Sequence, residues 1–109
     1  MVKQKVDNKE LQMEIPKTIR VGRRRYKILR PETLMGKRGD IFYAPGVIRV
    51  ARFAANGAAR RSPAAQAETF WHELTHAILH DIPHKLWCNE QFVTDFSKRL
   101  AKAVRSAKF

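Results

Sequence analysis

The chain has 109 residues, 44% of them hydrophobic, and its 22 Lys and Arg against 10 Asp and Glu give a formal net charge of +12. This length predicts one small domain with one core. No apolar run approaches the roughly 18 residues that a membrane-spanning helix needs, so we expect no membrane span.

The N-terminus and the cysteine content indicate the compartment. Residues before Thr18 mix charged and amide side chains without the apolar stretch of a secretion signal. Cys88 is the single cysteine, which excludes an internal disulfide and is typical of a reducing environment. We therefore expect a cytoplasmic protein.

The positive charge favours anionic partners, including nucleic acid. The densest basic run is Arg23–Arg25, beside Arg20 and Lys27. A solvated hairpin face explains this run more simply than a dedicated nucleic-acid site does. The charge alone therefore assigns no function.

The first half of the chain predicts strands. Residues 1–17 form a polar arm that ends near Pro16, and residues 18–109 form the folded domain. Ile19 and Val21 alternate with polar residues, and Tyr26 and Ile28 continue the pattern after a turn, which predicts a β-hairpin with one buried face. Residues 40–43 and 47–52 predict two further strands around the turn signal at 44–46.

The second half predicts two helices after a loop at residues 53–61. Ser62 is a typical N-cap, Pro63 suits the first helical position, and Pro83 ends the helix. The apolar residues of this first helix recur at helical spacing and can face the core: Ala67, Phe70, Trp71, Leu74 and Ile78. The second helix begins at Trp87 or Asn89, ends near Ser106 and has an apolar stripe of Phe92, Val93, Phe96, Leu100, Val104 and Ala107.

Strands first and helices afterwards predict an α+β fold. We expect a small antiparallel or mixed sheet of three to four strands, packed against both helices.

The first helix contains the motif His-Glu-x-x-His at residues 72–76. On a helix His72 and His76 lie one turn apart on one face, so their imidazoles can bind one metal ion. Glu73 is then placed to deprotonate a metal-bound water. The motif therefore predicts two zinc ligands and a general base.

A catalytic zinc usually has three protein ligands and one water. Glu90 stands at the start of the second helix, which can fold back antiparallel and direct this carboxylate at the metal. His80 is one turn beyond His76, but each four-residue step drifts by about 40° around a helix. We therefore predict His72, His76 and Glu90 as the ligands of one Zn²⁺.

Other residues are candidates for supporting roles. Tyr43, Tyr26 and His84 are candidate donors to a developing oxyanion, and the sequence does not choose between them. Asp95 is a candidate for orienting a histidine from behind. His80 and His84 remain weaker alternatives as ligands.

Two motifs resemble one family. Residues 72–80, His-Glu-Leu-Thr-His-Ala-Ile-Leu-His, are similar to the active-site helix of the ImmA/IrrE group of small gluzincin metallopeptidases. Residues 90–97 resemble that group's second-helix pattern Glu-x-x-Ala-Asn-x-Phe-Ala, although Thr75 stands where Gly is common. The chain is also similar to short phage and prophage proteins of this type.

The resemblance implies a zinc-dependent endopeptidase in the cytoplasm of a bacterium or a phage-infected host. Its ligands would be His72, His76 and Glu90, its base Glu73, and its partner a protein or peptide substrate. We expect that substrate to add as a strand along an exposed edge at residues 47–52, where Arg49 and Arg52 would favour acidic side chains. The alternative is a non-catalytic basic protein that binds nucleic acid or a protein partner and carries a structural or vestigial metal site.

Overall fold

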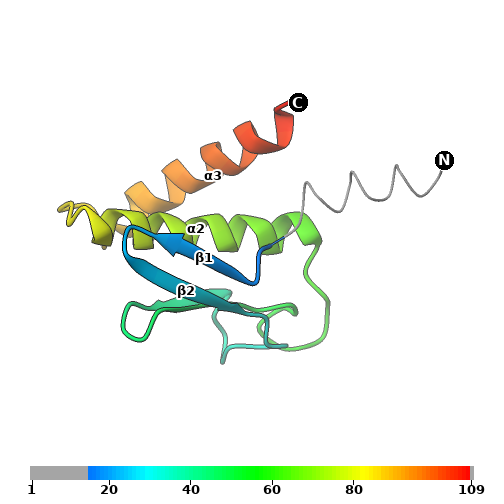
Figure 1. Ribbon diagram of the computed structural model, residues 1–109. Helices are drawn as coiled ribbons and strands as arrows, with labels where there is room; N and C mark the ends of the chain where they lie inside the picture. The colour runs from blue at the N-terminus through cyan, green and yellow to red at the C-terminus, as the bar shows by residue number, and fades with distance from the viewer. Residues whose placement is uncertain (1–14, 109) are drawn as a thin grey trace.

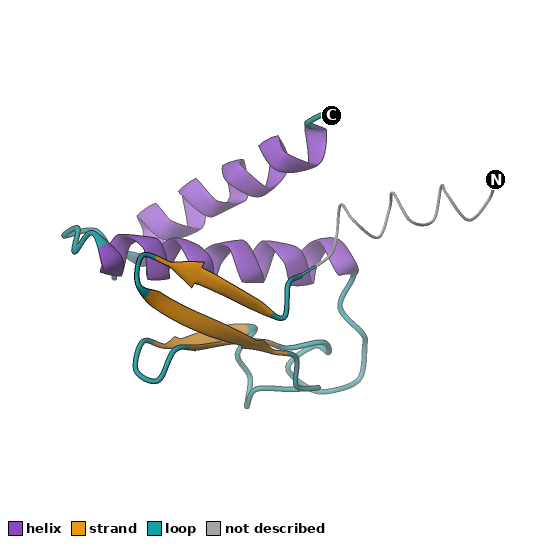
Figure 2. Cartoon of the chain, in the orientation of Figure 1, coloured by secondary structure: helices purple, strands orange, loops and turns teal. Residues whose placement is uncertain are grey.

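The computed structural model describes residues 15–108 and contains one sheet and two helices (Figure 2). The strands are β1 (Thr18–Val21), β2 (Arg24–Leu29), β3 (Gly39–Phe42) and β4 (Val47–Val50), followed by the helices α2 (Pro63–Asp81) and α3 (Glu90–Ser106). The sheet order is β1-β2-β4-β3. The pairs β1–β2 and β3–β4 are antiparallel and β2–β4 is parallel, so the predicted α+β fold has a mixed sheet.

The core begins before the expected boundary at Thr18. Ile15 is only 9% exposed and belongs to the hydrophobic core. The carbonyl of Lys17 accepts a hydrogen bond from the amide of Ile28 at 2.9 Å, which ties this segment to β2. The rest of the expected polar arm lies outside the described residues.

Alternation along the strands produces the core. Tyr26, Ile48 and Val50 are at most 1% exposed and face α2, while their neighbours in sequence face the other way. Gly22, at φ +61°, makes the turn between β1 and β2, because a residue without Cβ adopts positive φ freely. The predicted hairpin is confirmed.

The elements form successive layers (Figure 1). Helix α2 crosses one face of the sheet and contacts β1, β3 and β4. Helix α3 runs back antiparallel on α2 and diverges from it toward the C-terminus (Figure 1). Within residues 15–108, no helix covers the opposite face of the sheet. No described helix is long and apolar enough to cross a membrane.

The expected edge strand is wrong. Strand β4 pairs with β2 on one side and with β3 on the other, so it is central and residues 47–50 offer no free edge. The free edges belong to β1 and β3. The alternating pattern of β4 fits either position, because a period of two specifies faces rather than neighbours.

Helix α2 begins and ends where its local signals predict. The Ser62 hydroxyl accepts a hydrogen bond from the Ala65 amide at 3.0 Å, and the helix ends at Asp81 before Pro83. Its core line passes through Phe70, Leu74 and Ala77. Ile78, expected in the core, is 43% exposed because it lies further around the helix than this line.

Helix α3 is rotated relative to its apolar stripe. Val93, Ser97 and Ala101 are buried, whereas Phe96 is 48% and Val104 38% exposed. The buried residues lie three, seven and eleven positions after Glu90 and share its side of the helix. The side that presents Glu90 therefore packs on α2, and the expected stripe is only partly covered.

Candidate metal centre

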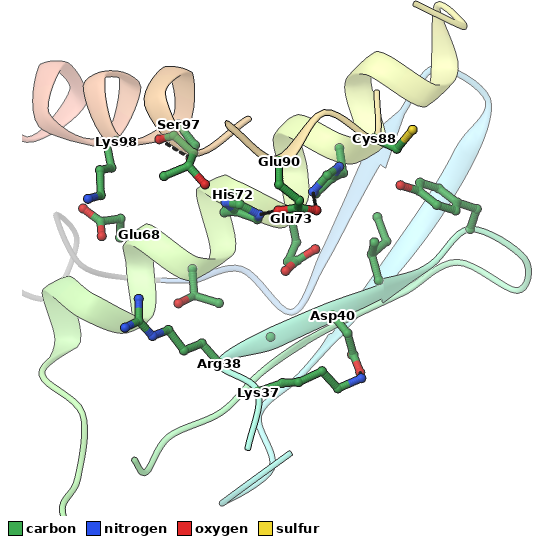
Figure 3. A pocket seen from close by; sticks show the side chains of 16 residues that line it. Lys37, Arg38, Asp40, Glu68, His72, Glu73, Cys88, Glu90, Ser97 and Lys98 are labelled. Carbon is green, nitrogen blue, oxygen red and sulfur yellow. Dashed lines mark hydrogen bonds and ion pairs between the residues drawn. The ribbon is translucent and has the colours of Figure 1, made fainter. Parts of the chain in front are cut away.

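Two helices bring together the three predicted ligands, of which Figure 3 labels His72 and Glu90. His72 and His76 project from one side of α2, and Glu90 is the first residue of α3, capped by the Asn89 side chain. The connection at residues 82–89 is compact, because the amides of Trp87 and Asn89 bond the carbonyls of His84 and Leu86 at 3.0 Å. The short loop thus directs the α3 N-terminus at the histidines.

The donor atoms lie close to the spacing that the ligands of one zinc ion would have. Glu90 Oε1 lies 3.1 Å from His72 Nε2, and Glu90 Oε2 lies 3.0 Å from His76 Nε2. All three residues offer ligand atoms within 4.8 Å of one another. Ligands of a tetrahedral zinc, with bonds of about 2.0–2.2 Å, lie roughly 3.3–3.5 Å apart. Small movements of these side chains would therefore accommodate the ion.

The hydrogen bond of His76 favours a cation at this position. His76 Nδ1 lies 2.6 Å from the carbonyl oxygen of Trp87, which only accepts, so Nδ1 carries the hydrogen. In the neutral ring Nε2 then presents a lone pair to the Glu90 carboxylate. Two acceptors face each other unless a proton or a metal ion lies between them. A backbone carbonyl behind a metal-binding histidine is the usual supporting contact.

The imidazole of His72 also faces the Glu90 carboxylate, with its Nε2 3.1 Å from Oε1. Burial lowers the pKa of its imidazole first, and the neighbouring His76 lowers it further, while the carboxylate of Glu90 opposes both effects. The neutral imidazole is the form that binds zinc. The donor set therefore fits a metal ion.

Glu73 lines the same cavity as His72, His76 and Glu90 but is not among the converging donors. It is 7% exposed, and burial raises the pKa of its carboxyl to about 8, with the charge of Glu90 as the second cause. A metal cation in the cluster would oppose both effects. The arrangement places the Glu73 carboxyl at the wall of the cavity, outside the set of converging donors.

The cluster opens into a cavity of about 550 Å³ between β3 and the two helices (Figure 3). Gly39, Asp40 and Ile41 of β3 line one side. Sequence reasoning missed three lining residues of α3, namely Thr94, Ser97 and Lys98. Their spacing of four, seven and eight from Glu90 puts them on its side of the helix, which is the signal that could have found them.

Cys88 lines this cavity but is not among the converging donors. A fully protein-ligated structural zinc would need a fourth donor. Among the described residues, the converging set is two histidines and one glutamate. This set leaves room for water or substrate.

Tyr43 and His80 flank the site as a pair. Their rings stack with centroids 4.0 Å apart, and Tyr43 lines the cavity. Burial raises the pKa of the Tyr43 hydroxyl to about 12, with the charge of Glu73 as the second cause, so this group stays a neutral donor. His80 is held by Tyr43 and by the edge of Trp87 and does not join the ligands.

Three other candidates lie away from the cavity. The exposed His84 accepts a hydrogen bond from the Leu86 amide at 3.0 Å and does not line the cavity. Asp95 accepts one from the Gln91 side chain at 3.1 Å on the exposed side of α3, so it orients neither ligand histidine. Tyr26 is 1% exposed within the core and cannot reach an oxyanion.

Comparisons with protein-family models, with curated proteins and with solved structures find no match for this chain.

Proposed function

We propose that this chain is a zinc-dependent metallopeptidase, with His72, His76 and Glu90 as metal ligands and Glu73 as the general base. The observation that carries the proposal is the convergence of the three donors from two helices, with a buried carboxyl beside them at the wall of a cavity. The resemblance of the two helix motifs to the ImmA/IrrE group supports the same assignment.

The proposed chemistry divides between the metal and the chain. A zinc ion held by these residues would supply Lewis-acid polarisation of the scissile carbonyl and would lower the pKa of a bound water, so that the water loses a proton and becomes a nucleophile. Glu73 accepts the proton of the attacking water and passes it to the leaving nitrogen. The Tyr43 hydroxyl lines the cavity and keeps its proton, so it can donate a hydrogen bond to a developing oxyanion.

The proposed substrate is a peptide that adds as a strand to β3. This strand has one unpaired side, and Gly39, Asp40 and Ile41 line the cavity. Main-chain hydrogen bonds along such an edge hold an extended peptide with little demand on its sequence. Arg49 no longer supports a preference for acidic substrates, because its guanidinium is bound by Asp40 at 2.8 and 2.5 Å.

Zinc content is the first test. We expect about one zinc per purified wild-type chain, as a three-ligand site requires, and loss or strong weakening in both His76→Ala and Glu90→Ala. His84→Ala is the matched control, because it removes an exposed imidazole outside the cluster. Zinc that is retained in Glu90→Ala as in wild type contradicts the ligand set.

Hydrolysis of an unfolded protein substrate is the second test. Glu73→Gln keeps the shape of the side chain but cannot accept the proton, so we expect zinc to stay bound and the rate to fall by about 10²- to 10⁴-fold. A Glu73→Gln protein that cleaves at the wild-type rate contradicts the role of Glu73. A zinc-loaded wild type without activity on any peptide contradicts the proposed reaction and leaves the metal site intact.

A further inference from the structure

The face of the sheet that points away from α2 carries a group of cations. Arg20 of β1 lies directly opposite Arg25 of β2, and Lys27 follows on the same face of β2. All three are exposed, and their sequence neighbours Val21, Tyr26 and Ile28 are buried on the other face. We call Arg20, Arg25 and Lys27 the basic face.

Nothing in the described part of the chain neutralises the basic face. The ion pairs among residues 15–108 that involve sheet residues join Asp40 of β3 to Lys37 and to Arg49 of β4, and neither includes a residue of the basic face. Like charges directly opposite each other on neighbouring strands destabilise a sheet. The basic face thus lowers the stability of the sheet and leaves its positive charges unbalanced among the described residues. Such a surface is suited to an anionic ligand.

An aromatic surface lies beside the basic face. Phe42 of β3 is 46% exposed, and the Arg49 guanidinium lies 5.0 Å from the centre of its ring. Arg49 is held in place by its two hydrogen bonds to Asp40. The aromatic ring and the fixed planar guanidinium form a surface on which a base can stack.

We propose that this face of the sheet binds single-stranded nucleic acid, with the basic face contacting backbone phosphates and the Phe42–Arg49 pair stacking a base. Four strands at about 4.8 Å spacing give a platform roughly 15 Å wide. An open sheet face that combines cations with an aromatic ring suits unpaired bases, whereas reading a duplex requires an element that enters a groove. An acidic protein would use the cations but not the stacking surface.

The test uses the full chain and a fluorescein-labelled 20-nucleotide oligo-dT, followed by anisotropy over a range of salt concentrations. We expect binding that weakens with salt, with a slope near −2 for about three phosphate contacts to a single strand. The variant Arg20→Gln, Arg25→Gln, Lys27→Gln should bring that slope close to zero and weaken binding at least tenfold at low salt.

A matched variant separates a defined surface from general positive charge. Arg99→Gln, Lys102→Gln, Arg105→Gln removes the same charge from exposed positions of α3. It should retain most of the affinity and the salt slope. Equal losses in the two triple variants would overturn the proposal, because the binding would then follow net charge alone.

The stacking component has its own control. Phe42→Ala should weaken oligo-dT binding by roughly 5- to 100-fold, the range for loss of one stacked base. Leu29→Ala removes another apolar side chain of similar exposure, 42%, from the same face and should change binding little. An equal effect of both variants, or tighter binding of a duplex or of polyphosphate than of oligo-dT, contradicts the proposed ligand.

The metal centre lies on the other side of the sheet, so the two sites should be separable. Glu90→Ala should bind oligo-dT as wild type does, whether or not it holds zinc. Loss of oligo-dT binding in this variant would show that the nucleic acid contacts the metal centre, which overturns the assignment to the outer face.

Discussion

Gly39 allows β3 to lie close to α2 at the wall of the cavity. A Cβ at this position would lie 2.5 Å from Thr69 Cγ2 and 2.8 Å from the carbonyl oxygen of Arg49. Both distances are far below the roughly 3.5–4.0 Å of favourable contact between carbon atoms. The Arg49 carbonyl belongs to the sheet backbone and cannot rotate away. Gly39→Ala therefore forces β3 to move relative to α2.

The expected loss follows from two opposing effects. Overpacking of this kind costs about 1–3 kcal/mol. The lower backbone entropy of Ala in the unfolded chain offsets about 0.4–1 kcal/mol of that cost. We expect Gly39→Ala to lower the free energy of unfolding by about 1–2 kcal/mol, which urea denaturation measures, and to lower the melting temperature by about 4–8 °C per kcal/mol.

Thr69→Ser tests whether the predicted contact is the cause. It removes Cγ2 and keeps the hydroxyl that donates to the Ala65 carbonyl at 3.2 Å. In the double variant Gly39→Ala, Thr69→Ser, we expect a favourable coupling of at least about 0.5 kcal/mol. Rescue should be incomplete because the Arg49 carbonyl remains. A Gly39→Ala protein as stable as wild type, or strictly additive effects, refutes the reasoning.

Three further predictions concern metal, charge and capping. Zinc at about 100 times its dissociation constant should stabilise wild type by about 2.7 kcal/mol and raise the melting temperature by roughly 10–20 °C in scanning fluorimetry, and His76→Ala should show no such rise. The hydrogen bond from Arg49 holds the pKa of the Asp40 carboxyl below its ordinary value. The ionised Asp40 therefore stabilises the folded chain fully above the ordinary pKa, and this stabilisation is lost as the pH falls through the lower pKa of the folded state. Asp40→Asn should therefore lower the free energy of unfolding by about 1 kcal/mol at pH 7. Urea denaturation should show the difference between wild type and variant disappearing below about pH 4, and a difference independent of pH would disprove the linkage. Ser62→Ala should cost about 1 kcal/mol and speed amide exchange in the first turn of α2, and unchanged exchange would show that the cap is not used.

Local signals predicted the parts of the fold that depend on near neighbours. The cap at Ser62, the stop before Pro83 and the one-turn spacing of His72 and His76 each depend on a few consecutive residues. Glu90 was also predictable, because a short loop between two helices makes them antiparallel neighbours. The convergence of His72, His76 and Glu90 therefore follows from sequence although these residues lie on two elements.

Strand order could not be predicted in the same way. The parallel pairing of β2 with β4 joins segments separated by the whole of β3. Ile48 and Val50 alternate with their neighbours whether β4 is central or at an edge. The edge strand that borders the cavity is thus decided by non-local pairing, and it is β3 rather than the expected β4.

Amphipathic patterns predict which side chains are able to pack, but not which partner covers them. Phe96 and Ile78 match helical periodicity, yet they are 48% and 43% exposed. The side of α3 that carries Glu90 packs on α2, near His72 and His76. Convergence of these three residues and burial of the apolar stripe require different rotations of α3, and the structure has the rotation that brings the three residues together.

What the net charge of +12 can bind depends on where the cations lie on the fold. The proposed metal centre joins His72, His76 and Glu90, with the buried Glu73 carboxyl beside them. The proposed phosphate contacts need exposed cations on a surface open to a long polyanion. The sheet separates these two proposed sites. Its inner face and the edge of β3 border the cavity, whereas its outer face presents Arg20, Arg25 and Lys27. The net charge alone does not distinguish these two surfaces, because it does not say on which face of the sheet each cation lies.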